Sequence, residues 1–183
     1  FTSDPSARLE FSHDTLAFDT IISTVPSATR TLTVFNRNKK GVRIASVSLA
    51  AGSSSHFRVN VDGEWLADGA GEDFKIYRKD TMIVRVEVTV PRVESSQVGT
   101  INDVLRFVME SGNVHEVVLQ ASAIDAYMVH GMVIDHDSTL LTDKPYLIYD
   151  SLYVAPGAQL SLLPGTRLMF HDDAAMHIHG SVH

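Results

Sequence analysis

The sequence predicts an all-β chain, with an antiparallel β-sandwich over residues 8–125 and the first rungs of a parallel β-helix over residues 126–183. Two observations lead to this prediction. Through most of the chain, Val, Ile, Thr and aromatic residues alternate with polar residues at a period of two, which is typical of half-buried strands. After residue 126 the alternating stretches shorten and Pro-Gly pairs separate them more closely, which is typical of a coil with short sides.

The predicted strands of the sandwich are short and separated by turn residues. The clearest covers residues 81–90, where aliphatic side chains occupy every second position and Pro91 ends the strand. Residues 104–109 and 114–121 are predicted to pair as a hairpin, because a short Gly-containing segment joins them. About seven such strands, with turns roughly every 8 to 12 residues, predict an immunoglobulin-like sandwich. The other strands that we expect are 28–36, 42–49 and 57–61, and residues 1–7 are expected to form a polar tether.

The predicted β-helix depends on short strands separated by corners. Within residues 152–170, two Pro-Gly pairs mark corners, and the apolar residues between them are expected to stack on the rung below. The last strand is predicted to run from Met176 to Val182, with His177 and His179 on its polar face. A solenoid that stops there exposes unpaired backbone and an open apolar stack. We therefore expect the native polypeptide to continue past His183.

Composition excludes several classes of function. The chain has 183 residues, of which 44% are hydrophobic, so it is long enough to bury a substantial core. Its formal charge of -7 argues against nucleic acid as a partner. The sequence has no cysteine, so disulfides, thiolate metal sites and a cysteine nucleophile are excluded. No glycine-rich phosphate loop is present, so we expect no nucleotide cofactor, and the apolar runs are too short for a membrane-spanning helix of about 20 residues.

Several segments resemble a known family. Residues 16–20, 28–36, 42–44 and 57–63 resemble the Hydin-type immunoglobulin-like module. Together with residues 144–149 and 163–171, their order is similar to that of surface lipoproteins of gut Bacteroidota, in which such a module precedes a right-handed parallel β-helix. The resemblance implies an extracytoplasmic lipoprotein of the outer membrane, held by an upstream lipid anchor and facing the cell exterior.

The same resemblance implies a function. It suggests a non-catalytic cell-surface module for structure and binding, accessory to a TonB-dependent complex that imports glycans or peptides, with other outer-membrane proteins as partners. Two alternatives remain open at this point. One is an adhesin or host-contact β-helix protein, and the other is the non-catalytic part of a carbohydrate-active β-helix enzyme.

A second resemblance concerns modification. Asp followed by Ser or Thr and then a small or aliphatic residue is similar to the O-glycosylation signal of secretory proteins of Bacteroidota. The alternative is that these Asp side chains simply open strands and turns by local capping. The hydroxyl residues concerned are Thr15, Thr20, Thr81, Ser138 and Ser151.

The candidate chemical groups are few, and none predicts a catalytic residue. His177 and His179, two positions apart on the predicted last strand, point the same way and are weak candidates for a metal site, although exposed histidines without a metal are the simpler interpretation. Paired carboxylates at Asp135 and Asp137, and at Asp172 and Asp173, resemble glycan-cleaving pairs only in composition, because each pair falls in a polar turn or corner.

Trp65 is the residue that we single out for ligand binding. It is the only tryptophan, and it lies in the segment 63–71, which is predicted to be an exposed glycine-rich loop. Exposed aromatic side chains commonly anchor ligands, because they offer a large apolar face together with a polar edge. The alternative is that Trp65 folds back to cover an edge of the sandwich.

Overall fold

The computed structural model describes residues 1–92 and 99–183 and is all-β. A single 3-10 turn, η1 (Gly52–Ser54), is the only helical segment in the described ranges. The chain divides into two compact units, the first formed by residues 1–91 with 99–123 and the second by residues 124–183 together with Arg92. The predicted boundary at 125/126 thus lies two residues later than the observed one. No helix in the described part of the chain is long and apolar enough to cross a membrane.

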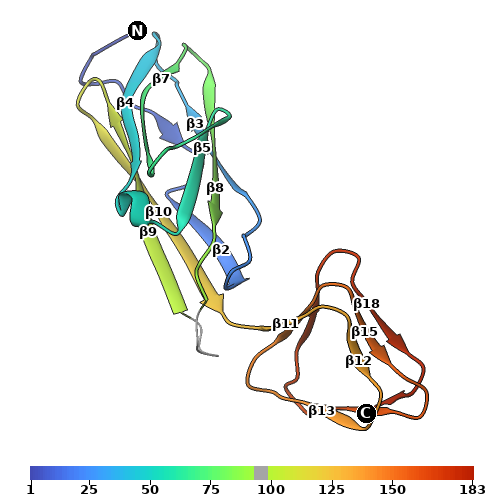
Figure 1. Ribbon diagram of the computed structural model, residues 1–183. Helices are drawn as coiled ribbons and strands as arrows, with labels where there is room; N and C mark the ends of the chain where they lie inside the picture. Colours follow the sequence, from blue (N-terminus) through green and yellow to red (C-terminus); the bar gives the residue numbers. More distant parts are fainter. Residues whose placement is uncertain (93–98) are drawn as a thin grey trace. The chain divides into compact units, whose positions relative to one another are not determined.

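The first unit is a sandwich of two five-stranded sheets (Figure 1). One sheet has the strand order β1-β3-β8-β5-β6 and the other β2-β10-β9-β4-β7. Neighbouring strands are antiparallel from β1 to β6 in the first sheet and from β10 to β7 in the second. The strands are β1 (Glu10–Phe11), β2 (Thr15–Ile22), β3 (Arg30–Phe35), β4 (Val42–Leu49), β5 (Phe57–Val61), β6 (Glu64–Trp65), β7 (Ala70–Ile76), β8 (Thr81–Val88), β9 (Gly99–Met109) and β10 (Val114–Ile124).

This strand order is that of an immunoglobulin-like fold. The series β1-β3-β8-β5 corresponds to strands A-B-E-D, and β10-β9-β4 to G-F-C. The sequence-based prediction of an immunoglobulin-like antiparallel sandwich is therefore confirmed. So is the predicted hairpin, although its strands β9 and β10 are longer than expected.

Alternating residues of both sheets form the core of the sandwich. Along β8, every second side chain from Met82 to Val88 is fully buried. Contacts between aromatic rings join the two sheets, with Phe18 of β2 packing on Phe57 of β5 at a centroid distance of 5.7 Å. The hydrophobic effect of burying these residues stabilises the sandwich by roughly 2 kcal/mol for each large side chain.

Residues 1–7, which we expect to be a tether, lie against the sandwich. The Thr2 N–H donates to the Gly41 carbonyl at 2.8 Å, and the buried Ala7 packs on Val42. Asn113, in the β9–β10 turn, donates from its amide nitrogen to the carbonyls of Pro5 and Ala7, each at 2.9 Å. Side-chain amides therefore satisfy the backbone groups of a segment whose own residues are mostly polar.

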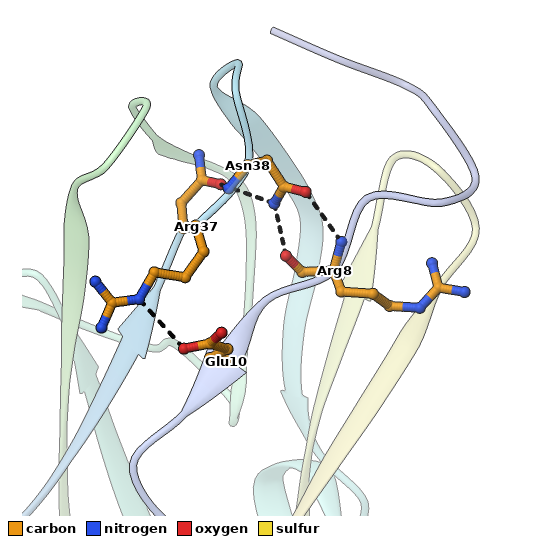
Figure 2. A network of polar contacts seen from close by, with 5 residues as sticks. Arg8, Glu10, Arg37 and Asn38 are labelled. Carbon is orange, nitrogen blue, oxygen red and sulfur yellow. Dashed lines mark hydrogen bonds and ion pairs between the residues drawn. The ribbon is translucent and has the colours of Figure 1, made fainter.

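The next residues are held in the same way (Figure 2). The Asn38 carboxamide donates to the Arg8 carbonyl at 2.6 Å and accepts from the Arg8 N–H at 3.4 Å, so it pairs with Arg8 as a peptide group of a neighbouring strand would. The Arg37 guanidinium donates to the Glu10 carboxylate at 3.2 Å. Because both ends of that ion pair are exposed, it contributes at most about 1 kcal/mol.

The second unit consists of three parallel sheets, and the chain passes through all of them in turn, three times. All pairs of neighbouring strands are parallel. Figure 1 shows a coil of triangular outline, with β12, β15 and β18 side by side along one edge. The strands are β11 (Tyr127–Val129), β12 (Met132–Ile134), β13 (Ser138–Leu140), β14 (Tyr146–Ile148), β15 (Ser151–Val154), β16 (Gln159–Leu162), β17 (Leu168–Phe170), β18 (Ala175–Ile178) and β19 (Ser181–Val182).

Side chains that face the inside of the coil stack from turn to turn, and their burial changes along the stack. Ile148 and Val154, in the second turn, are fully buried. Their register partners in the third turn, Phe170 and Ile178, are 41% and 52% exposed. The third turn therefore presents an apolar surface, which we call the end face: Leu168, Phe170, Met176, Ile178 and Val182.

The prediction of one strand from Met176 to Val182 is wrong. β18 ends at Ile178 and β19 begins at Ser181, and the two belong to different sheets. Gly180 lies at the corner between them, where an added Cβ would overlap the carbonyl oxygens of Ala155 and Ala158. The close approach of these backbones requires glycine and ends the strand.

Candidate ligand-binding surface around Trp65

Two tight turns hold Trp65 in place. Asp62 and Gly63, with φ angles of 49° and 101°, form a two-residue hairpin turn between β5 and β6. Asp68 and Gly69, with φ angles of 51° and 74°, form a second turn just after β6. Asp-Gly is favoured in turns of this kind because both positions need a left-handed backbone. The predicted glycine-rich loop is thus a short strand between two turns, with Trp65 at its end.

Trp65 is 46% exposed. The Arg58 guanidinium, on the adjacent strand β5, lies over the indole ring at 4.5 Å from its centroid. Such a contact contributes about 0.5–1 kcal/mol at an exposed site and restricts the rotation of the ring. Trp65 is therefore neither a free loop residue nor a buried cover of the sandwich edge.

A depression of about 200 Å³ adjoins Arg58. The residues that line it include Ser53, Ser55 and Asp68, together with Leu66. The lining of the depression therefore contains both polar and apolar residues.

Residues 51–55, three of which line this depression, are held in place by hydrogen bonds to Asp103. The buried carboxylate of Asp103 accepts hydrogen bonds from the Ser55 hydroxyl at 2.5 Å and from the N–H groups of Ala51 and Val104 at 3.2 and 2.7 Å. The Phe57 N–H donates to the Ser55 hydroxyl at 3.1 Å. These bonds fix the loop before any ligand arrives, which reduces the entropic cost of binding.

Two wider depressions elsewhere on the sandwich are less suited to binding the apolar face of a ligand. One, of about 320 Å³, is lined by the N-terminal segment with Lys39 and Lys40. Another, of about 420 Å³, is lined by His13, Thr15 and Arg30 among others. No Trp, Tyr or Phe side chain lines either of them. Trp65, by contrast, is exposed and is contacted by Arg58, which lines a depression.

The structure separates the two histidines that were weak candidates for a metal site. His177 belongs to β18, whereas His179 lies in the bend after it, with its ring 5.2 Å from that of Tyr153. The assumption that they share one strand face is wrong. Across the described residues, no cluster of three or more His, Asp or Glu side chains could hold a metal ion.

Sequence reasoning missed a column of rings on the second unit. His130, Tyr149 and His171 stack at one corner of three successive turns, with centroid distances of 4.6 and 4.8 Å. They lie about one turn apart in sequence, so a search for aromatic residues at the solenoid period would have found them. Neighbouring rings of this column therefore cover part of each other's faces.

The four carboxylates of the two candidate pairs are exposed, and two of them make local hydrogen bonds. Asp135 bonds to the His136 ring at 2.6 Å, and this hydrogen bond holds the pKa of Asp135 below its usual value. Asp137 accepts the Gln159 N–H at 2.9 Å and so fixes the start of β16. Asp172 and Asp173 lie in an exposed corner. The general acid of a glycosidase needs a raised pKa, and Asp135, whose pKa is lowered, does not meet that requirement.

The predicted acceptors of O-glycosylation differ in exposure. Thr15, Thr20 and Thr81 are exposed, whereas Ser138 and Ser151 are half-buried. The Ser138 hydroxyl donates to the His136 carbonyl at 3.0 Å. At Thr81, the preceding Asp80 accepts the Thr81 N–H at 2.8 Å, which is the local capping that we gave as the alternative.

Comparisons with known proteins identify no family. No family model matches the sequence, and no curated protein matches it. A family 123 glycoside hydrolase from Clostridium perfringens has a solved structure that superposes with a TM-score of 0.47 at 6% identity, over 69% of this chain and 31% of that one. The chain thus covers less than a third of that enzyme.

Two other solved structures are similar to a comparable degree. The PapD-like domain 7 of human CEP192 superposes with a TM-score of 0.41 at 16% identity, over 68% of this chain and 89% of that one. A protein of unknown function from Porphyromonas gingivalis W83 superposes with a TM-score of 0.43 at 17% identity, over 73% and 60%. With TM-scores below 0.5, these similarities assign neither a family nor a function to this chain.

Proposed function

We propose that this chain is a non-catalytic binding module of a bacterial cell surface, and that its sandwich binds a glycan at Trp65. The observation that carries the proposal is a half-exposed tryptophan, held between two Asp-Gly turns and covered in part by Arg58, a residue that also lines a depression. A rigid aromatic side chain loses little conformational entropy when a ligand binds, so most of the contact energy contributes to affinity.

The chemistry of this surface suits a sugar better than a peptide side chain. A pyranose ring has an apolar C–H face that packs on an aromatic ring, and hydroxyls at its edge that need hydrogen-bond partners. Asp68 accepts hydrogen bonds, and the Ser53 hydroxyl both donates and accepts them. A saccharide that packs its apolar face on Trp65 and extends past Arg58 would meet these groups.

Substitution of Trp65 tests this proposal. An array of neutral and acidic oligosaccharides would first identify a ligand, and calorimetry would then measure its Kd. We expect Trp65→Ala to weaken binding by about 2 kcal/mol, or roughly 30-fold, and Trp65→Phe to weaken it less.

The matched control is Tyr77→Ala, which removes another exposed aromatic side chain of the sandwich, 64% exposed and outside the Trp65 surface. It is expected to leave the Kd unchanged. Equal affinity of the wild type and Trp65→Ala, or equal losses in Trp65→Ala and Tyr77→Ala, would rule out the proposed site.

We further propose that the second unit is the beginning of a parallel β-helix. Three passes through three parallel sheets, with inward side chains stacked in register, support this interpretation. The order of an immunoglobulin-like module and such a coil supports the resemblance to surface lipoproteins of Bacteroidota. In that setting, the chain would be accessory to a TonB-dependent importer of glycans or peptides.

The membrane setting has its own test. The native protein would be isolated from outer membranes under mild conditions, and its partners identified by mass spectrometry. We expect a TonB-dependent importer to co-purify with it. Recovery of the protein without an importer would contradict the accessory role and favour a free-standing adhesin.

A further inference from the structure

Trp65 belongs to a row of side chains on the outer face of its sheet. In β5, the first, third and fifth residues are buried in the core, so Arg58 and Asn60 point to the outer face. Asn60 lies opposite Trp65 of β6 on one side and opposite Arg85 of β8 on the other. Neighbouring strands are about 4.8 Å apart, and directly opposite residues share a face of the sheet. Trp65, Asn60 and Arg85 therefore form a row about 10 Å long, which we call the Trp65 row.

The middle residue of this row has a hydrogen-bond donor without an acceptor. Asn60 is only 6% exposed, although it points outward. Its Oδ1 accepts from the Gly63 N–H at 2.9 Å, whereas its Nδ2 donates to no group among residues 1–92 and 99–183. Leaving a nearly buried amide donor without a partner costs free energy. Its acceptor must therefore come from outside the chain, from solvent or from a ligand that lies over the row.

Two arginines bring positive charge to the same place. Arg85 is exposed and forms neither a hydrogen bond nor an ion pair with the residues that the structure describes. The Arg58 guanidinium lies over the Trp65 ring and likewise forms no ion pair in these ranges. Both guanidiniums therefore keep their N–H donors available to a ligand.

The carboxylates of this face are occupied by other donors. Glu87 lies opposite Arg58 in the strand register, but it accepts from the Thr29 hydroxyl at 2.8 Å. Asp62, in the turn after β5, accepts from the Ile83 N–H at 2.8 Å. The Trp65 row thus combines an aromatic ring with several N–H donors that lack acceptors.

Donors of this kind favour an anionic ligand. A guanidinium is planar and can donate two parallel hydrogen bonds to a carboxylate, which makes arginine well suited to binding that group. We infer that the Trp65 row binds acidic saccharides, with a sugar ring on Trp65 and the carboxylate of the saccharide bound by Arg85 and Asn60. Arg58 adds a second positive charge beside it. The inference rests on the proposed function and adds to it the class of glycan and the residues that recognise its charge.

An array with paired ligands tests the class of glycan. It carries oligosaccharides that contain uronic or sialic acids, each with its carboxylates free and as methyl esters, together with neutral oligosaccharides. The free acids are expected to bind at least about tenfold more tightly than their esters, because esterification keeps the sugar ring but removes the charge. Esters or neutral glycans that bind as tightly as the free acids overturn the inference. The proposed function survives that result if Trp65→Ala still weakens binding, whereas binding of no glycan at all overturns both.

Substitution of Arg85 tests the position of the carboxylate. At low salt, Arg85→Gln is expected to weaken binding of the free acid about tenfold and to leave binding of its methyl ester unchanged. Thermal unfolding should show no change in Tm, since Arg85 forms no hydrogen bond or ion pair with the described residues. Calorimetry measures both dissociation constants.

The matched control is Arg106→Gln. It removes one positive charge from the outer face of the other sheet, where Arg106 pairs with Glu116 at 2.8 Å. This variant is expected to bind the free acid as the wild type does. Equal affinity of the wild type and Arg85→Gln for the free acid would overturn the inference, and so would equal losses in Arg85→Gln and Arg106→Gln, since these would indicate an effect of net charge alone.

Discussion

Asn36 is a buried polar residue whose hydrogen bonds stabilise one end of the sandwich. It follows β3, is 1% exposed, and donates from its amide nitrogen to the carbonyls of Lys40, Ile76 and Tyr77 at 2.9, 3.0 and 3.0 Å. Its own amide oxygen accepts from the Asn38 N–H at 3.0 Å. One side chain thus joins the β3–β4 connection to the end of β7.

The cost of Asn36→Ala follows from the burial of these carbonyls. The one on Ile76 becomes a buried acceptor without its donor, at about 2 kcal/mol, and the two partly buried ones add about 0.5 kcal/mol each. The expected loss in the free energy of unfolding is therefore about 3 kcal/mol. For a unit of this size, that corresponds to a decrease in Tm of about 12 °C.

Urea denaturation followed by tryptophan fluorescence measures this loss. Trp65 is the only tryptophan and lies in the same unit as Asn36, so its signal reports the unfolding of the sandwich. The matched control is Asn102→Ala, an exposed position on β9, which is expected to change stability by less than about 0.5 kcal/mol. A loss below about 1 kcal/mol in Asn36→Ala would refute this account of the network.

Two further predictions concern the second unit. Gly180→Ala places a Cβ against the backbone oxygens of Ala155 and Ala158 and is expected to unfold the third turn locally. The expected result is faster hydrogen exchange in β18 and β19 and unchanged exchange in β11. Unchanged exchange in all three strands would contradict the close approach. Burial alone would raise the pKa of Asp125, but the Lys144 ammonium, which donates to it at 2.7 Å, and other neighbours hold that pKa below its usual value. Asp125 therefore stabilises the fold above the ordinary carboxyl pKa of about 3.9, and this stabilisation is lost as the pH falls through the lowered pKa. Lys144→Met is expected to cost about 2 kcal/mol at neutral pH and less once the pH is well below about 3.9, measured by thermal unfolding, and an equal cost under both conditions would contradict this linkage.

Much of the fold was predictable because its signals are local. The alternation over residues 81–90 and the short turn before Val114 indicated strands and a hairpin, since both depend on residues that are neighbours in sequence. The Pro-Gly corners likewise indicated short strands in the second unit. The candidate site was predictable only in part. Trp65 stood out as the single tryptophan, but the sequence carried no sign that Arg58 lies over its ring.

The sequence by itself determined the all-β class, the immunoglobulin-like sandwich and six of its ten described strands, because side-chain periodicity and turn residues act over a few positions. Only the tertiary structure decided which distant groups meet. Residues 1–7 look like a tether until Asn113 binds their carbonyls, and residues 176–182 look like one strand until the backbone carbonyl oxygens of Ala155 and Ala158 crowd Gly180. The physical reason is that pairing register and backbone approach depend on how the whole chain packs, and no local pattern records them.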